Sequence, residues 1–228
     1  MSKILVVAPH ADDETLGMGG TIARLANEGN HVTVAVMTGH GEKEKHPLWE
    51  RTYWDTIRNE AQSAMKVLGV EQLLFAEIPA ALVSHTSPVE VNREAWKMIE
   101  RVEPDVLYIP FSWDLHTDHR VLSYAFSVAW RPHTELGRRI RQVYMYETQS
   151  ETHWNYSSGI EPGFIPNTWV DITETLAIKL EAMNRYQSQL RAFPDARSLE
   201  ALEALAQWRG SQASMKAAEG FILVRALS

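Results

Sequence analysis

The 228-residue sequence contains no cysteine. Disulfide bonds and thiolate metal sites are therefore excluded, and any metal ion would have to be bound by histidine and carboxylate side chains. An excess of basic residues is also lacking, because 22 lysines and arginines stand against 29 aspartates and glutamates, for a formal net charge of -7. Proteins that bind nucleic acid usually carry a basic face, so we predict no nucleic-acid partner.

Long hydrophobic runs are missing as well. The apolar run at residues 4–8 is far shorter than the roughly 20 residues that cross a bilayer, and no other segment approaches that length. Its position near the N-terminus could suggest a signal peptide, but His10, Asp12, Asp13 and Glu14 follow at once. We therefore expect a cytoplasmic protein with no transmembrane segment.

Strand-like and helix-like segments alternate over the first two thirds of the chain. The composition, with 45% hydrophobic and 22% charged residues, is that of an ordinary globular protein. Strands that alternate with helices of this length predict an α/β fold: a Rossmann-like, doubly wound, mostly parallel sheet with helices on both faces. The predicted strands cover residues 4–8, 31–37, 73–78, 105–111 and 143–147. The predicted helices cover residues 16–28, 50–68, 88–102 and 118–130.

The pattern changes in the last third of the chain. The elements predicted there are a polar loop at 149–166, a short strand at 168–172 and helices at 174–191 and 199–215. We predict a single domain over residues 1–228, with a Rossmann-like core at 1–148. The mainly helical C-terminal extension, residues 149–228, is expected to pack on the sheet and complete the substrate cleft. A homo-oligomer is compatible with the sequence, because sequence alone does not separate free surface from interface.

Two dense clusters of histidine and aspartate carry the chemistry. The first, Pro9-His10-Ala11-Asp12-Asp13-Glu14, directly follows the first predicted strand, at the end where open parallel sheets bind their ligands. His10 and Asp13 are three residues apart across a turn that can aim both side chains at one point. Imidazole nitrogen and carboxylate oxygen are standard zinc ligands, and Asp12 between them is available for another role.

The second cluster, Asp114-Leu115-His116-Thr117-Asp118-His119, follows the fourth predicted strand. In a doubly wound sheet the first and fourth strands flank the point where the strand order reverses, so both loops open into one crevice. His119 would then complete a set of three protein ligands with His10 and Asp13, leaving one position for water, as in catalytic zinc sites.

A less specific interpretation has to be weighed against this metal site. A single His-Asp pair at the end of a strand more often belongs to a turn or a helix cap, and Asp13 could cap the helix that follows it. Two such clusters at the two strands of the switch point are much less expected by chance. Together they favour the metal site.

At these residues the sequence resembles the zinc-dependent deacetylases of the PIG-L/LmbE type, which act largely on N-acetylglucosamine-containing substrates. That family carries Ala-His-Pro-Asp-Asp-Glu after its first strand, where this chain has Pro9 to Glu14 with the two residues that flank His10 exchanged. The family's His-Pro-Asp-His corresponds to His116-Thr117-Asp118-His119. Further similar segments are Gly17–Gly20, Arg58–Ala61, Tyr146-Glu147, Arg209-Gly210 and Ala218–Phe221.

These positions predict a hydrolytic mechanism with one zinc ion per chain, bound by His10, Asp13 and His119. Zinc would lower the pKa of its water and polarise an acetyl carbonyl. Asp12 would act as general base and later protonate the departing amine, the role that the resemblance also assigns to it.

The remaining residues of the two clusters have supporting roles in this mechanism. His116 would stabilise the oxyanion as imidazolium, with Asp118 orienting the His116 ring. Glu14 is expected in the outer shell or at the helix N-terminus, where a negative charge is favoured.

Substrate contacts are less well marked in the sequence. Arg51 and Arg58 are candidates for hydroxyl or phosphate contacts, although an arginine on a helix more often forms a solvated face or an ion pair. Trp113, next to the second cluster, could stack on a sugar ring or be a core or rim tryptophan. The segment Gly17–Gly20 lacks the spacing of a nucleotide-binding loop and is better explained by close packing of helix and sheet.

The sequence therefore predicts a metal-dependent N-deacetylase that removes the acetyl group from an N-acetylglucosamine-type amino sugar or its conjugate. The alternatives are a metal-dependent hydrolase of another amide, ester or phosphoester, and a non-catalytic carbohydrate-binding relative. Retention of Asp12 and all three ligands disfavours the binding module. Iron or cobalt could occupy the same ligands in place of zinc. The aglycone and the exact sugar are not identified by any segment.

Overall fold

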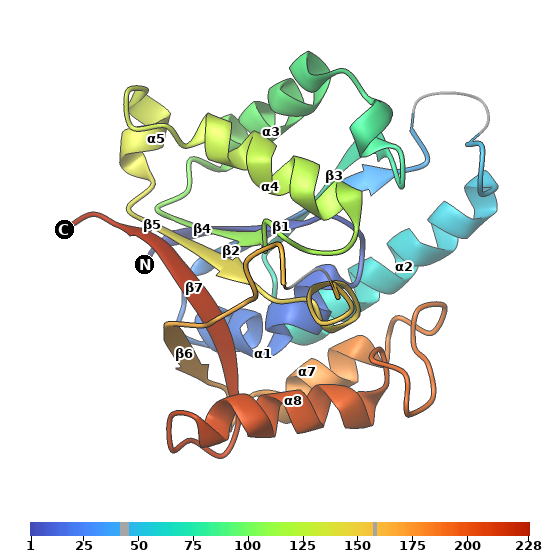
Figure 1. Ribbon diagram of the computed structural model, residues 1–228, viewed down its shortest axis with the longest axis vertical. Helices are drawn as coiled ribbons and strands as arrows, with labels where there is room; N and C mark the ends of the chain where they lie inside the picture. The colour runs from blue at the N-terminus through green and yellow to red at the C-terminus, as the bar shows by residue number, and fades with distance from the viewer. Residues whose placement is uncertain (42–45, 157–158) are drawn as a thin grey trace.

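The computed structural model describes residues 1–41, 46–156 and 159–228. In this part of the chain one seven-stranded sheet has the order β3-β2-β1-β4-β5-β7-β6 and lies between layers of helices (Figure 1). The strands are β1 (Lys3–Ala8), β2 (His31–Gly39), β3 (Gln72–Pro79), β4 (Val106–Pro110), β5 (Gln142–Tyr146), β6 (Thr168–Asp171) and β7 (Ala218–Ala226). The first five strands are parallel to their neighbours, whereas β7 is antiparallel to β5 and to β6. This arrangement confirms the predicted Rossmann-like α/β fold.

Strand β1 lies in the middle of the parallel part. Its residues from Ile4 to Ala8 are all buried, because helices cover both faces of the sheet. Val6 pairs with Val34 of β2 on one side and with Tyr108 of β4 on the other. The chain leaves β1 toward β2 and returns to β4, so the switch point of the sheet lies between β1 and β4.

The helices form two layers (Figure 1). On one side of the sheet α3 (Pro88–Val102) packs against α4 (Thr117–Ala129). On the other side α1 (Asp13–Asn27) and α2 (Arg51–Leu68) are joined by α7 (Leu176–Met183), while α8 (Leu199–Ser211) lies against β6 and β7. Short turns of helix complete the described elements: η1 (Val83–His85), α5 (Glu135–Arg139) and α6 (Gln149–Thr152). None of these helices has the length and apolarity that a membrane span requires.

The C-terminal segment differs from its prediction in two details. It contains the helices α7 and α8, but it also adds β7, which was not predicted. Only the first part of β7, Ala218–Phe221, is buried. The sequence of β7 therefore lacks the continuous apolar run by which a buried strand is recognised. Helix α7 ends at Met183 rather than continuing to residue 191. Beyond it, Ser188 donates both its amide and its hydroxyl to the Glu60 carboxylate of α2, which fixes a turn there.

The glycines near the start of α1 allow the helix to lie close to the sheet and to the C-terminal segment. A Cβ at Gly17 would collide with the Tyr146 ring of β5, and one at Gly20 would lie 2.7 Å from the Ile172 side chain. The close packing predicted for Gly17–Gly20 is confirmed by this geometry. Between these glycines the helix is kinked at Met18, where φ is -148° and ψ is 25°.

The kink in α1 leaves backbone groups free, and two buried charged side chains bind them. Glu219 of β7 accepts the amides of Gly20 and Thr21 at 3.1 and 2.7 Å. Lys179 of α7 donates to the Leu16 carbonyl at 2.9 Å and to Glu219 at 2.6 Å. The C-terminal segment therefore fixes the helix that begins beside the first motif.

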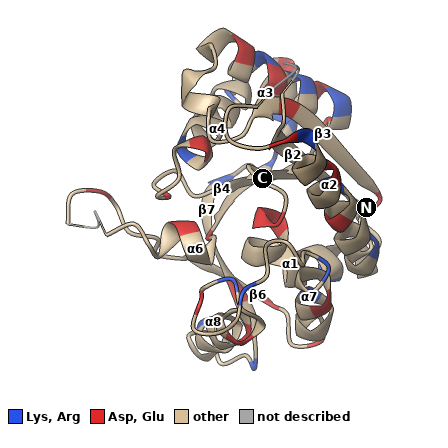
Figure 2. Ribbon diagram, turned by 90° about the vertical axis from the view of Figure 1, so that its right-hand side faces the viewer, with Lys and Arg blue, Asp and Glu red and all other residues tan. Residues whose placement is uncertain are grey.

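Charged positions are distributed over the helices. Figure 2 shows basic and acidic segments interspersed along α3 and along α8 rather than gathered on separate faces. No separate basic face is therefore seen on these two helices.

Candidate metal centre

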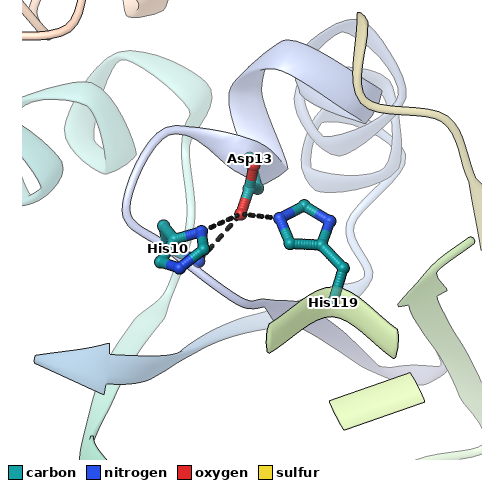
Figure 3. A group of neighbouring side chains, drawn as sticks. All are labelled: His10, Asp13 and His119. Carbon is teal, nitrogen blue, oxygen red and sulfur yellow. Dashed lines mark hydrogen bonds and ion pairs between the residues drawn. The ribbon is translucent and has the colours of Figure 1, made fainter. Parts of the chain in front are cut away.

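The two sequence clusters meet at the carboxyl edge of the sheet. His10 follows β1, Asp13 is the first residue of α1, and His119 lies in the first turn of α4. Because β1 and β4 are adjacent and parallel, the loops that leave them share one edge. Figure 3 shows His10 and His119 on either side of the Asp13 carboxylate.

The distances in this group suit a metal ion. Asp13 Oδ2 lies 3.3 Å from His10 Nδ1 and 3.1 Å from His119 Nε2, and the three ligand atoms all lie within 4.8 Å of one another. Ligands about 2.1 Å from a tetrahedral zinc ion are separated by about 3.4 Å, so little rearrangement is needed. His119 Nε2 is buried and forms no hydrogen bond, although it lies in an ion pair with Asp13 Oδ2. A buried ring nitrogen that faces only another potential ligand atom fits a metal ion between the two.

The other nitrogen of each ligand ring faces a carboxylate. His119 Nδ1 lies 2.8 Å from Asp114 Oδ2, and His10 Nε2 lies 3.0 Å from Asp118 Oδ2. Such outer partners fix the tautomer and the orientation of metal-binding histidines. The donor set and its surroundings therefore fit a zinc ion on His10, Asp13 and His119. Asp114 was part of the quoted motif, but the sequence did not assign it a role.

The ionisation of the ligands reflects this pairing. Burial alone would lower the pKa of His10, but hydrogen bonds to Asp118 and Asp13 outweigh it and raise that pKa to about 9. Burial would raise the pKa of Asp13, and the positive charge of His119 instead holds it well below the usual range. A metal ion would replace the ring protons in this network, since histidine binds metal in its neutral form.

Asp118 lies near both His116 and His10. Its Oδ2 is 3.9 Å from His116 Nδ1, farther than the 3.0 Å to His10 Nε2. The carboxylate also accepts the amides of Ala81 and Val83, at 2.6 and 3.2 Å. Asp118 therefore orients the ligand His10 more directly than it orients His116, and it anchors the loop that follows β3.

His116 caps the N-terminus of α4. Its Nδ1 accepts the Asp118 amide at 3.1 Å, which leaves the proton of a neutral ring on Nε2. Burial and the nearby positive charge of His10 lower the pKa of His116 to about 4. In this structure the contacts describe a neutral ring with its proton on Nε2, and the role of His116 at the oxyanion stays a prediction.

Asp12, the predicted general base, lies between the loop residue Ala11 and the first residue of α1, Asp13. It is buried, and its Oδ2 has no hydrogen-bond partner. Its backbone has a φ of 133°, a strained conformation that costs roughly 1–3 kcal/mol for a residue other than glycine and is often found at active sites. Burial raises the pKa of Asp12 to about 8, although the charge of Arg197 opposes this shift.

Two residues of the C-terminal segment approach this site and were missed by sequence reasoning. Arg197, before α8, has its Nη1 3.9 Å from Asp12 Oδ2. Tyr186, after α7, donates its hydroxyl to Glu14 Oε1 at 2.7 Å, and Glu14 Oε2 accepts the amide of Asp12. Glu14 thus supports the Asp12 backbone, in agreement with its expected outer position. No local pattern marks Arg197 or Tyr186, because both reach the site only through the tertiary fold.

The three predicted substrate contacts lie in different surroundings. Arg51 is exposed at the start of α2, and its Nη2 lies 3.4 Å from His40 Nδ1. Arg58 forms an ion pair with Glu77 and lies over the Phe75 ring, which matches the ion-pair alternative.

Trp113 is 40% exposed and borders a pocket lined by aromatic and polar side chains. The lining includes Phe111, His153, Tyr156 and Phe164. An exposed ring beside such a pocket can stack on a sugar.

The comparison with protein families identifies the chain. The family model of PIG-L, described as GlcNAc-PI de-N-acetylase, matches residues 5–130, which is more than half of the sequence. The chain belongs to the PIG-L family. It is therefore an enzyme of the N-deacetylase class, as the motifs predicted.

Relatives and solved structures agree with this family. The diacetylchitobiose deacetylase of Thermococcus kodakarensis is 28% identical over 208 residues, covering 86% of this chain and 72% of the relative. The structure of N,N'-diacetylchitobiose deacetylase from Pyrococcus horikoshii has a TM-score of 0.75 at 24% identity, covering 98% of this chain and 84% of that one.

A third structure shows how far the fold extends. The 4-carboxy-2-hydroxymuconate hydratase from Pseudomonas putida has a TM-score of 0.77 at 22% identity, covering 100% of this chain and 98% of that one. The fold thus carries more than one kind of reaction, and the substrate has to be argued from the site.

Proposed function

We propose that this enzyme removes the acetyl group from an N-acetylglucosamine-type amino sugar or its conjugate, with one zinc ion on His10, Asp13 and His119 and with Asp12 as general base. The main observation behind this proposal is that two buried atoms, His119 Nε2 and Asp12 Oδ2, form no hydrogen bond. One suits a metal ion, and the other suits the water or amine on which a base acts. The Thermococcus kodakarensis relative is named for the deacetylation of diacetylchitobiose, an N-acetylated sugar, which supports this substrate class.

The residues of the site divide the chemistry among them. His10, Asp13 and His119 would hold a zinc ion, which when bound would supply Lewis-acid chemistry by lowering the pKa of water and polarising a carbonyl. Asp12 accepts a proton from the attacking water and returns it to the nitrogen of the departing amine. His116 donates from Nε2 to the carbonyl oxygen as negative charge develops there.

The outer residues keep this arrangement in place. Asp114 and Asp118 orient the rings of His119 and His10, at 2.8 and 3.0 Å. We propose Arg51 and Trp113 as residues that contact the substrate, because their side chains are exposed. Arg58 is engaged with Glu77 and is not included.

A phosphoesterase with two metal ions is the main rival. A second group of potential ligands, His10, His116 and Asp118, exists among the described residues, but it shares His10 with the first group. A neutral imidazole binds one metal ion, so His10 completes only one of the two groups, which favours one metal ion and amide hydrolysis.

The test couples zinc content to acetate release from N-acetylglucosamine and from N,N'-diacetylchitobiose. We expect about one zinc per chain in the wild type and in Asp12→Ala, because Asp12 is not a ligand. Loss of the base should reduce kcat by about 10²- to 10⁴-fold. Asp55→Ala, an exposed aspartate on α2, is the matched control and should keep full activity.

Each outcome has a distinct consequence. Full activity of Asp12→Ala would refute the role of Asp12. Hydrolysis of a phosphoester without acetate release would favour the phosphoesterase, and two zinc ions per chain would do the same. Acetate release by the wild type alone would support the proposal.

A further inference from the structure

The Arg197 guanidinium lies between two carboxylates and forms an ion pair with each, but a hydrogen bond with neither. Its Nη1 lies 3.9 Å from Asp12 Oδ2, and its Nη2 lies 3.6 Å from Glu151 Oε1. Neither distance is within hydrogen-bonding range. The attraction between the charges remains, because it falls only slowly with distance in a partly buried site.

Neutral groups hold the guanidinium at this position. Nε donates to the Ser150 hydroxyl of α6, and Nη1 donates to Gln189 Oε1, both at 3.3 Å. The two ends of the loop from residue 191 to residue 197 are hydrogen-bonded to each other, since the Arg191 amide donates to the Arg197 carbonyl at 3.3 Å. The next residue, Ser198, caps α8. The place of the guanidinium is therefore fixed by the fold and does not depend on Asp12.

The surroundings of Asp12 make such a neighbour necessary. Asp13, Glu14 and Glu151 add negative charge around the same site, and Asp12 itself has a strained backbone. In the described part of the chain, Arg197 is the lysine or arginine that forms an ion pair with Asp12. Without its charge, repulsion from the other acids would favour other positions of the Asp12 side chain.

We propose that Arg197 is a positioning residue for Asp12, holding the carboxylate by charge while leaving Oδ2 free to exchange a proton. A direct hydrogen bond would occupy the oxygen that the base needs, whereas a separation of 3.9 Å does not. This inference rests on the proposed role of Asp12 as general base.

The experiment compares Arg197→Gln and Arg197→Lys with Arg191→Gln. Arg191 is a matched control, because it lies in the same segment and its guanidinium donates to the carbonyls of Ser188 and Leu190 rather than to a carboxylate of the site. Steady-state kinetics with N,N'-diacetylchitobiose, zinc content and the melting temperature are measured for each variant. A misplaced catalytic group typically lowers the rate by about 10²-fold.

We expect Arg197→Gln to lower kcat by about 10- to 100-fold, with KM within about twofold and with unchanged zinc content and melting temperature. Arg197→Lys should recover part of the loss, because it restores the charge. Arg191→Gln should match the wild type. In an Asp12→Ala background, Arg197→Gln should cause no further loss, because a residue that acts through Asp12 has nothing left to position.

Other results would overturn the proposal. A raised KM with unchanged kcat would make Arg197 a substrate-binding residue, and a loss of zinc or of melting temperature would make its role structural. Additive losses in the double variant would show that it acts independently of Asp12. Full activity of Arg197→Gln beside an inactive Asp12→Ala would reject this inference alone, whereas an active Asp12→Ala would reject the proposed function.

Discussion

Helix α1 has a cluster of buried charges at each end of its first two turns, and the two clusters differ in how their polar atoms are satisfied. At the kink, Lys179 and Glu219 bind each other and the free backbone groups of α1. Neither side chain has a buried atom without a partner. At the helix start, Asp12 Oδ2 and His119 Nε2 are buried with no hydrogen-bond partner.

This difference indicates that the cluster at the kink has a structural role and that the cluster at the helix start has a functional one. Burying a charged or polar group without a partner is unfavourable, so folded proteins rarely retain one that has no use. The satisfied pair of Lys179 and Glu219 fixes the backbone of α1, whereas the atoms without hydrogen bonds lie where the proposed metal ion and substrate would complete the site. Variants in each cluster should therefore affect different quantities.

The largest effect on stability is expected at the satisfied cluster. Lys179→Met leaves Glu219 buried without its cation, and breaking one partner of a buried pair typically costs about 3–5 kcal/mol. We expect the free energy of unfolding in urea to fall by about this amount. Intact metal ligands should still bind zinc in the protein that remains folded.

A matched control separates the effect of breaking a buried ion pair from the effect of replacing any lysine by methionine. Lys97→Met breaks the pair of Lys97 and Glu94 on α3, in which the lysine is 55% exposed. Exposed pairs contribute at most about 1 kcal/mol, so its stability should change little. Equal losses in Lys179→Met and Lys97→Met would contradict the structural role given to the buried pair.

A smaller effect, on metal affinity rather than on folding, is expected around His119. Asp114→Asn removes the charge that orients the His119 ring, and zinc affinity should fall by about 10- to 100-fold in a chelator competition. Thr152→Val removes the hydroxyl that donates to Asp114 at 2.6 Å and accepts the Thr148 amide at 2.8 Å. It leaves the charge of Asp114 in place, so its effect on affinity should be smaller. An affinity that is unchanged in Asp114→Asn would show that Asp114 does not act through the metal centre.

The fold could be predicted from sequence where its signals are local. The buried run of β1, the proline at the start of α3 and the glycine after α2 mark these elements within a few residues. The two His/Asp motifs locate the centre because each follows a strand of the switch point, and parallel neighbours share an edge.

What the sequence did not reveal depends on contacts between distant segments. Strand β7 joins the sheet by pairing with β5 and β6, and its own pattern is only half buried. Arg197 lies 185 positions after Asp12 in the chain, and nothing near it resembles a motif. The orientation of Asp118 toward His10 likewise depends on the geometry of the loop. A cytoplasmic location, the choice of zinc and a homo-oligomer stay predictions.

The most direct test of the central claim is the zinc content of the purified wild type and of His119→Ala, measured by mass spectrometry of the metal after dialysis. The account predicts about one zinc per chain in the wild type and a nearly complete loss in the variant, because one of three ligands is gone. Zinc retained at the wild-type level in His119→Ala would contradict the account, since the unpartnered nitrogen of His119 would then not be a ligand.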